Sequence, residues 1–212
     1  MAVEADRQKM VDAARARFGG LDVLVNNAGI GATGHFMDTK PETLRAIFDT
    51  NYYGTVEVTR AFLPLLKAGS EPTIVNISSV LGRRAWPARG LYSASKFAIA
   101  GWSEAIRAEL QREGVAVLVV NPGLTQTNFS KNMLEQRAML PLDHLRGMTP
   151  GAVADATLAA LAAGKNEVTL TTRGKLLVLV SRIAPWLIDH FAKKKIRKLF
   201  KDEIAARKQT VA

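Results

Sequence analysis

Three short and almost continuous apolar runs, separated by long helical patterns, constrain the fold of this chain more than any other feature. The runs are LDVLVNN (residues 21–27), TIVNIS (73–78) and VAVLVVN (115–121). Apolar residues at successive positions are typical of strands buried on both faces, as in a parallel sheet. A shorter fourth strand is predicted at EVTL (167–170).

Helical spacing accounts for the segments between these strands. The predicted helices are Glu4–Phe18, stopped by two glycines; Pro41 to about Lys67, with Thr39 as a candidate cap; about Leu91 to Arg112; and 149–164. Strands that alternate with helices of this length indicate an α/β fold with a parallel sheet. A chain of 212 residues is long enough to bury a real core.

Composition excludes several classes of protein. The chain has no cysteine, which rules out a disulfide framework and a thiolate metal site. Its three histidines, His35, His144 and His190, are scattered, so we expect no metal. We find no secretory signal and no apolar segment of the roughly 20 residues that a membrane span needs. A cytoplasmic location is therefore expected.

Polar residues follow each of the three main strands. NNAG comes after the first strand, SS after the second and NPG after the third. In parallel sheets, ligands bind in the crevice beyond the carboxyl ends of the strands. We therefore expect a binding site at this edge of the sheet.

The segment YSASK places Tyr92 four residues before Lys96 at the start of a helical pattern, so both side chains lie on one face. A tyrosine has a reference pKa of about 10, and a neighbouring ammonium group is expected to lower it. Such a tyrosine can serve as a general acid or base. Taken alone, such a pair is more often only a solvated helix face.

Five motifs in order resemble the short-chain dehydrogenase/reductase family: NNAG (26–29), the asparagine of NYYG, NISS (76–79), YSASK (92–96) and PGLTQT (122–127). The resemblance covers about residues 1 to 170. It implies a Rossmann-like, doubly wound parallel sheet. It also implies an oxidoreductase that interconverts a carbonyl and a secondary alcohol by hydride transfer with NAD or NADP.

The resemblance also implies roles for individual residues. Tyr92 would be the general acid or base, Ser79 would hydrogen-bond the substrate oxygen, and Lys96 would hold the nicotinamide ribose. Asn51 would position a water in a proton relay; alternatively, it is a buried polar residue at a helix irregularity. The cofactor would contact Asn26, Ala28, Gly29, Tyr92, Lys96, Pro122, Gly123, Thr125 and Thr127. The loop from Leu124 to Met148 would form a wall of the substrate site.

The family's N-terminal Gly-rich phosphate-binding turn is missing from this sequence, in which only 25 residues precede NNAG. We therefore expect an N-terminally truncated sheet in which residues 21–27 form an apolar edge strand, prone to pairing. Three explanations stay open: a fragment of a normal enzyme, which we favour; a product that has lost catalysis; and a chain completed by a partner. The alternative function is a non-catalytic remnant that binds a membrane or a partner.

Residues 173–212 form a predicted basic, amphipathic helical extension to a catalytic domain of residues 1–172. From Arg173 to Lys208 there are eleven lysines and arginines against three acidic residues, which accounts for most of the net charge of +10. Apolar residues recur there at helical spacing, with Pro185 interrupting. The pattern suits a helix in an anionic membrane interface, which would favour an apolar, lipid-like substrate. Packing over the substrate pocket or in a homo-oligomer contact is the main alternative, and nucleic-acid binding is disfavoured.

Overall fold

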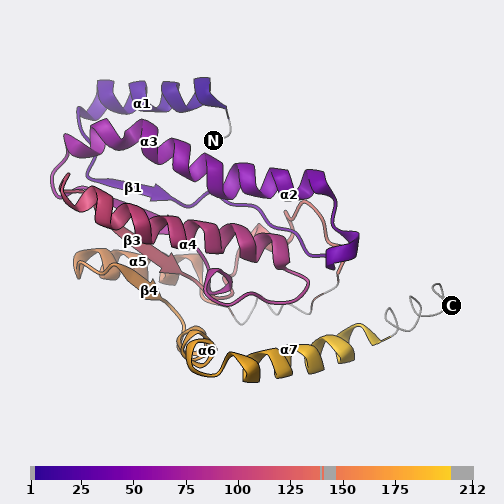
Figure 1. Ribbon diagram of the computed structural model, residues 1–212. Coiled ribbons are helices and arrows are strands. Elements are labelled where there is room, and N and C mark those ends of the chain that lie inside the picture. Colours follow the sequence, from indigo (N-terminus) through magenta and orange to yellow (C-terminus); the bar gives the residue numbers. More distant parts are fainter. Residues whose placement is uncertain (1–2, 139, 141–146, 202–212) are drawn as a thin grey trace.

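A four-stranded parallel sheet forms the centre of the protein, in a computed structural model that describes residues 3–138, 140 and 147–201. Its order is β1-β2-β3-β4 (Figure 1). The strands are β1 (Val23–Asn26), β2 (Thr73–Ile77), β3 (Ala116–Asn121) and β4 (Glu167–Thr169). Because all pairings are parallel, the carboxyl ends of the strands meet at one edge of the sheet.

Helices connect the strands in the order predicted from the sequence. They are α1 (Glu4–Phe18), α2 (Pro41–Phe48), α3 (Gly54–Lys67), α4 (Gly90–Gln111), α5 (Pro150–Ala162), α6 (Thr172–Ile183) and α7 (Pro185–Leu199). A π-helical turn, Asp49–Tyr53, joins α2 to α3. Short 3₁₀ turns lie at Phe36–Asp38, Val80–Gly82 and Asn128–Ser130. The α/β prediction is therefore confirmed, with helix and strand ends shifted by a few residues at most.

The predicted cap of α2 is wrong. Lys40 occupies the N-cap position, and the Thr39 hydroxyl instead donates to the His35 carbonyl at 2.8 Å. Pro41 begins the helix. Because proline has no amide hydrogen and a backbone already set for the first helical turn, it initiates α2 with one fewer donor to satisfy.

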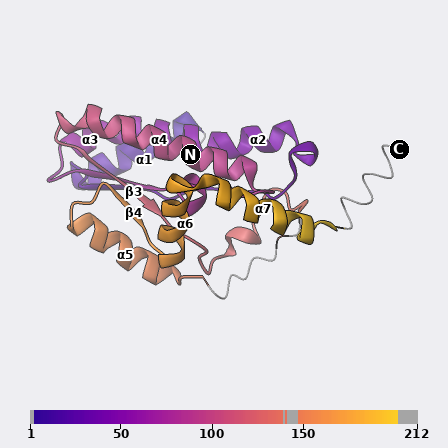
Figure 2. The same ribbon diagram turned by 60° about the horizontal axis from the view of Figure 1, so that its bottom comes forward.

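Helices cover both faces of the sheet, as Figure 2 shows with α3 and α4 on one side and α5 on the other. Alternate residues of each strand supply the two cores, since successive side chains point to opposite faces. On β2, Ile74 packs with Leu66 of α3, while Val75 packs with Ala160 of α5. This two-sided burial explains why the strand sequences are apolar at successive positions.

Strand β1 forms an edge of the sheet, as predicted. Within the described residues it pairs only with β2. Val25 is 52% exposed, because its side chain lies on the α5 face at a point where α5 does not reach. An apolar residue on an open edge is a site for strand pairing, and that association stays a prediction.

Buried amides tie the sheet to α3 and α4. The Asn26 side-chain amide donates to the Asn76 side-chain oxygen (2.8 Å) and to the Thr59 hydroxyl (2.9 Å). The Asn76 amide in turn donates to the Ser103 hydroxyl at 2.9 Å. Buried polar groups of this kind are costly to leave unpaired, so the chain of bonds fixes how the helices sit on the strands.

Replacing Asn76 with alanine should destabilise the fold strongly. Asn76 is fully buried, and its loss removes one hydrogen bond each from Asn26 and Ser103 and leaves a new void beside them. We expect the free energy of unfolding, measured by urea denaturation, to fall by about 2–4 kcal/mol. Asn166→Ala, at an exposed position, is the control and should change it by less than about 0.5 kcal/mol. Equal effects of the two substitutions would contradict this account.

Candidate active site

Ser79 and Tyr92 meet at the carboxyl edge of the sheet. Ser79 follows β2, where its oxygen accepts a hydrogen bond from the Leu81 amide at 3.1 Å and so caps the turn Val80–Gly82. Tyr92 lies in the first turn of α4, where the Ser79 side chain acts to lower its pKa. Both side chains are buried. The structure therefore brings together two hydroxyl groups thirteen residues apart.

Lys96 lies one turn further along α4, on the same face as Tyr92. Its ammonium donates to the carbonyl of Ile77, the last residue of β2, at 2.8 Å. Its Nζ atom is 5.8 Å from the centroid of the Tyr92 ring. Burial lowers the pKa of Lys96 from 10.5 to about 8, because a buried ammonium loses its hydration.

The expected effect of Lys96 on Tyr92 needs correction. We expected the ammonium to lower the tyrosine pKa, yet burial raises the pKa of Tyr92 above its usual value of 10. The opposing effects come from the hydrogen bond with Ser79 and from the positive charge of Arg89.

Asn51 lies at the centre of the π-helical turn, and its side chain is hydrogen-bonded to other parts of the protein. Its side-chain oxygen accepts from the Ile30 amide (2.8 Å), and its amide donates to the Ile30 carbonyl and the Ser95 hydroxyl, each at 2.9 Å. These bonds tie the segment after β1 to α4. Asn51 thus occupies a helix irregularity, as the alternative interpretation held, and the proton relay stays a prediction.

The segment after β1 passes very close to the catalytic candidates. A Cβ atom added to Gly29 would lie 3.3 Å from the Asn51 side-chain oxygen and 3.4 Å from the Lys96 Nζ atom. Ala28 is exposed, whereas the Asn26 side chain is buried and bonded within the core. Ala28 and Gly29 are therefore placed for contact with a ligand, and the Asn26 side chain has a structural role.

The segment after β3 lies next to these groups. The Pro122 carbonyl accepts from the Val80 amide at 2.9 Å, which joins this segment to the Ser79 turn. Gly123 and Thr125 are partly exposed, and Thr127 is exposed and caps the turn Asn128–Ser130. Of the predicted wall from Leu124 to Met148, residues 139 and 141–146 lie outside the described part of the chain.

Two residues of the site were not predicted. The Arg89 guanidinium carbon lies 5.3 Å from the centroid of the Tyr92 ring, and the Phe129 ring packs against the Tyr92 ring with their centroids 5.3 Å apart. Arg89 precedes Tyr92 by three residues, a spacing that places both on one helix face and was a usable signal. Phe129 belongs to an irregular loop, and nothing in its local sequence marks it.

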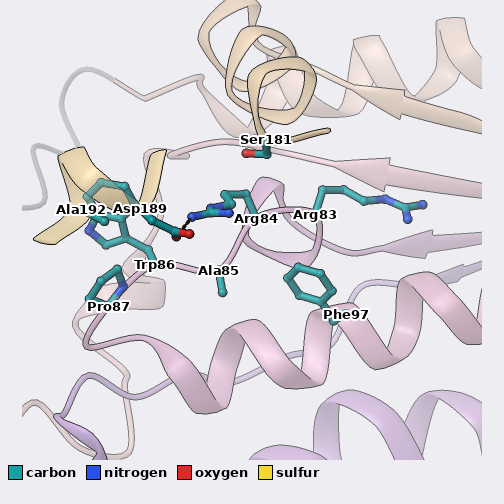
Figure 3. A pocket seen from close by; sticks show the side chains of 9 residues that line it. All are labelled: Arg83, Arg84, Ala85, Trp86, Pro87, Phe97, Ser181, Asp189 and Ala192. Atoms are coloured by element: carbon teal, nitrogen blue, oxygen red, sulfur yellow. Dashed lines mark hydrogen bonds and ion pairs between the residues drawn. The ribbon is translucent and has the colours of Figure 1, made fainter. Parts of the chain in front are cut away.

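A separate pocket of about 560 Å³ lies between residues 83–87 and the tail helices (Figure 3). The Arg84 and Asp189 side chains form an ion pair across it, while Arg83 points away from this pair. The Lys195 ammonium lies 5.6 Å from the Trp86 ring centroid. The lining residues are Arg83, Arg84, Ala85, Trp86, Pro87, Phe97, Ser181, Asp189 and Ala192, so the pocket excludes Ser79, Tyr92 and Lys96.

The family model for short chain dehydrogenases matches residues 1–138, and the chain belongs to that family. Dehydrogenase/reductase SDR family member 7B of Bos taurus is 34% identical over 186 residues, which make up 85% of this chain and 57% of that protein. Uncharacterized oxidoreductase YxnA of Bacillus subtilis (strain 168) is 32% identical over 196 residues, or 90% of this chain and 55% of that protein. The chain thus spans little more than half the length of these relatives.

Solved structures confirm the Rossmann-like fold. A short chain dehydrogenase from Burkholderia cenocepacia J2315, determined in complex with NADP, superposes with a TM-score of 0.75 at 30% sequence identity. The match covers 90% of this chain and 76% of that one. A short-chain dehydrogenase from Streptomyces avermitilis gives a TM-score of 0.76 at 27% identity, over 93% of this chain and 77% of that one.

The depressed pKa of Lys96 predicts a pH-dependent stability. Between about pH 8 and pH 10.5 the unfolded chain holds a proton on Lys96 that the folded chain has lost, so the free energy of unfolding should rise with pH. The full change is about 3 kcal/mol relative to Lys96→Met, which lacks the group. Urea denaturation across this range measures it, and Lys165→Met, at an exposed position, should behave as the parent chain. Parallel pH profiles for the parent and Lys96→Met would contradict the prediction.

Proposed function

We propose that the protein catalyses the interconversion of a carbonyl and a secondary alcohol with NAD or NADP, with Tyr92 as the general acid or base. The observation that carries the proposal is the meeting of two buried hydroxyl side chains, Ser79 and Tyr92, with Lys96 one turn away, at the carboxyl edge of a parallel sheet. Ligands of such sheets bind at this edge. Membership of the short-chain dehydrogenase family supports the same assignment.

In carbonyl reduction, each residue of the site has its own role. When bound, the nicotinamide supplies a hydride to the carbonyl carbon. Ser79 donates a hydrogen bond to the carbonyl oxygen, on which negative charge develops, and Tyr92 transfers its hydroxyl proton to that oxygen. Lys96 holds the nicotinamide ribose, and Asn51 positions the segment that carries Gly29. Oxidation of the alcohol runs through the same groups in reverse.

The described residues fit the nicotinamide half of a dinucleotide. One region is surrounded by the buried ammonium of Lys96, the closely approaching backbone of Gly29, and the partly exposed Gly123 and Thr125. Ala28 lies exposed on the side where the adenosine half would continue. The Burkholderia cenocepacia relative was solved with NADP, and either NAD or NADP is compatible with these contacts. Packing of Phe129 on Tyr92 supports an apolar substrate.

Oxidation of NADH or NADPH in the presence of apolar ketones and aldehydes tests the proposal. Tyr92→Phe removes the proton donor and should lower kcat/KM by at least about 100-fold, and Ser79→Ala should lower it by about 100-fold. Tyr53→Phe, at an exposed position, should leave the rate unchanged. A chain that binds either cofactor yet shows no turnover, or turnover that survives in Tyr92→Phe, would favour the non-catalytic alternative.

A second proposed function is peripheral binding to anionic membranes through the tail helices α6 and α7. One side of α7 packs on the body of the protein through Ala192 and Phe200. Exposed apolar residues lie on both tail helices: Leu176, Leu179 and Ile183 on α6, and Trp186 and Phe191 on α7. Exposed lysines and arginines follow in the last turns of α7. An apolar stripe beside dense positive charge suits a membrane interface.

No helix among residues 3–138, 140 and 147–201 is long and apolar enough to cross a membrane. In the alternative, this tail only packs against the rest of the protein. The Arg84–Asp189 ion pair and the pocket that the tail helps to line support that alternative. A second alternative is homo-oligomerisation through the exposed stripe.

Co-sedimentation with lipid vesicles tests the membrane proposal. The chain should bind vesicles that contain phosphatidylserine more strongly than pure phosphatidylcholine, and added salt should weaken the binding. Ile183→Asp places a charge in the stripe, at a residue 75% exposed, and should weaken binding at least several-fold. The matched control is Leu158→Asp on α5, 61% exposed, which should have no effect. Equal loss in both variants, or no binding by the parent chain, would contradict the proposal.

A further inference from the structure

Arg89 is a buried cation at the N-cap of α4, beside the proposed catalytic tyrosine. Only 6% of the residue is exposed. Its Nε atom is buried without a hydrogen-bond partner, and its guanidinium forms no ion pair within the part of the chain that the structure describes. What it contacts is the Tyr92 ring, with 5.3 Å from the guanidinium carbon to the ring centroid.

An unpaired buried charge is destabilising, so the burial of Arg89 calls for a compensating interaction. The groups that face Tyr92 are few. Lys96 lies on the same helix, Ser79 comes from the turn after β2, and Phe129 comes from the loop after β3. Among the described residues no carboxylate faces the ring. The phenolate of Tyr92 is thus the anion available to Arg89.

The backbone before Arg89 is held in a conformation that alanine rarely adopts. Ala88 has a φ of 62°, in the left-handed region. Its carbonyl accepts from the Gly34 amide at 3.0 Å, and its side chain packs with Ala138 and with Phe200 of the tail. Such backbone strain persists only where surrounding contacts impose it. The contacts around Ala88 therefore fix where Arg89 enters the helix.

We propose that Arg89 is a positioning residue that stabilises the phenolate form of Tyr92 and thereby makes this tyrosine a stronger acid. In reduction the tyrosine proton passes to the substrate oxygen, and the ring that then carries the negative charge is the one beside the guanidinium. Lys96 is committed to the Ile77 carbonyl and lies further from the ring. The proposal deepens, and rests on, the proposed general acid–base role of Tyr92.

The electrostatics of the two groups agree with this arrangement. Arg89 opposes the effect of burial on the pKa of Tyr92, and the charge of Tyr92 in turn raises the pKa of Arg89 against its own burial. Because each group favours the charged form of the other, the pair is coupled. Removing the cation should leave only the hydrogen bond of Ser79 to oppose the burial of Tyr92.

The test is a titration of Tyr92 in the full chain, independent of turnover. The three tyrosines, Tyr52, Tyr53 and Tyr92, are replaced biosynthetically with 3,5-difluorotyrosine, whose lower pKa brings the titration into a range where the protein is folded. Fluorine NMR follows each ring, and Tyr92→Phe assigns the signal. Arg89→Met and Arg89→Gln should each raise the pKa of the ring at position 92 by about 1 unit or more. Arg89→Lys should restore part of the difference.

Arg84→Met is the matched control, since Arg84 lies nearby but pairs with Asp189. It should leave the titration unchanged. A shift below about 0.3 units in both neutral Arg89 variants, or an equal shift in Arg84→Met, would overturn the proposal. Should neither neutral variant fold, the Nε–H signal of Arg89 in the parent chain decides: it must move with the Tyr92 titration, and a signal that does not move overturns the proposal. If replacing Arg89 shifts the Tyr92 pKa as expected but the protein shows no turnover, the result counts against the proposed function and not against the role of Arg89.

Discussion

The joint between α4 and the end of β2 is the constraint on which the site depends. Lys96 donates to the Ile77 carbonyl at 2.8 Å, and the Ser78 hydroxyl donates to the Lys96 carbonyl at 3.0 Å. The turn that follows approaches so closely that a Cβ on Gly82 would lie 2.8 Å from the Lys96 carbonyl oxygen. Only glycine fits there. This contact sets the helix register, and the register places Tyr92 against Ser79.

A second set of bonds joins the segment after β1 to the same helix. Asn51 bonds both to Ile30 and to Ser95, and the Ser95 hydroxyl donates to the Tyr92 carbonyl at 2.8 Å. The π-helical turn thus places the Asn51 side chain where it can bond both to the segment after β1 and to α4. Functional sites often contain such π-helical turns. The site is therefore supported from three sides, by β2, by α4 and by the segment after β1.

The spacing of apolar residues, and the glycines and prolines that bound the helices, made most of the fold predictable. Ile74 and Val75 face different cores, so an uninterrupted apolar run correctly indicated a strand covered on both sides. The site residues predicted by resemblance cluster at one edge, but their electrostatics could not be read from spacing. Tyr92 and Lys96 are four residues apart in any helix; only burial decides that the pKa of Lys96 falls and that of Tyr92 rises. Phe129 reaches Tyr92 through tertiary contacts that no local pattern encodes.

The central claim is that this chain holds a preassembled site for the nicotinamide half of a dinucleotide, and it can be tested without turnover. Reduced nicotinamide mononucleotide, which lacks the adenosine half, would be titrated into the isotopically labelled 212-residue chain and followed by amide NMR. The account predicts concentration-dependent shifts at Gly29, Gly123 and Thr125, with none at these residues when adenosine monophosphate replaces it. Unchanged signals at these three residues at millimolar concentrations, or equal shifts with both compounds, would contradict it.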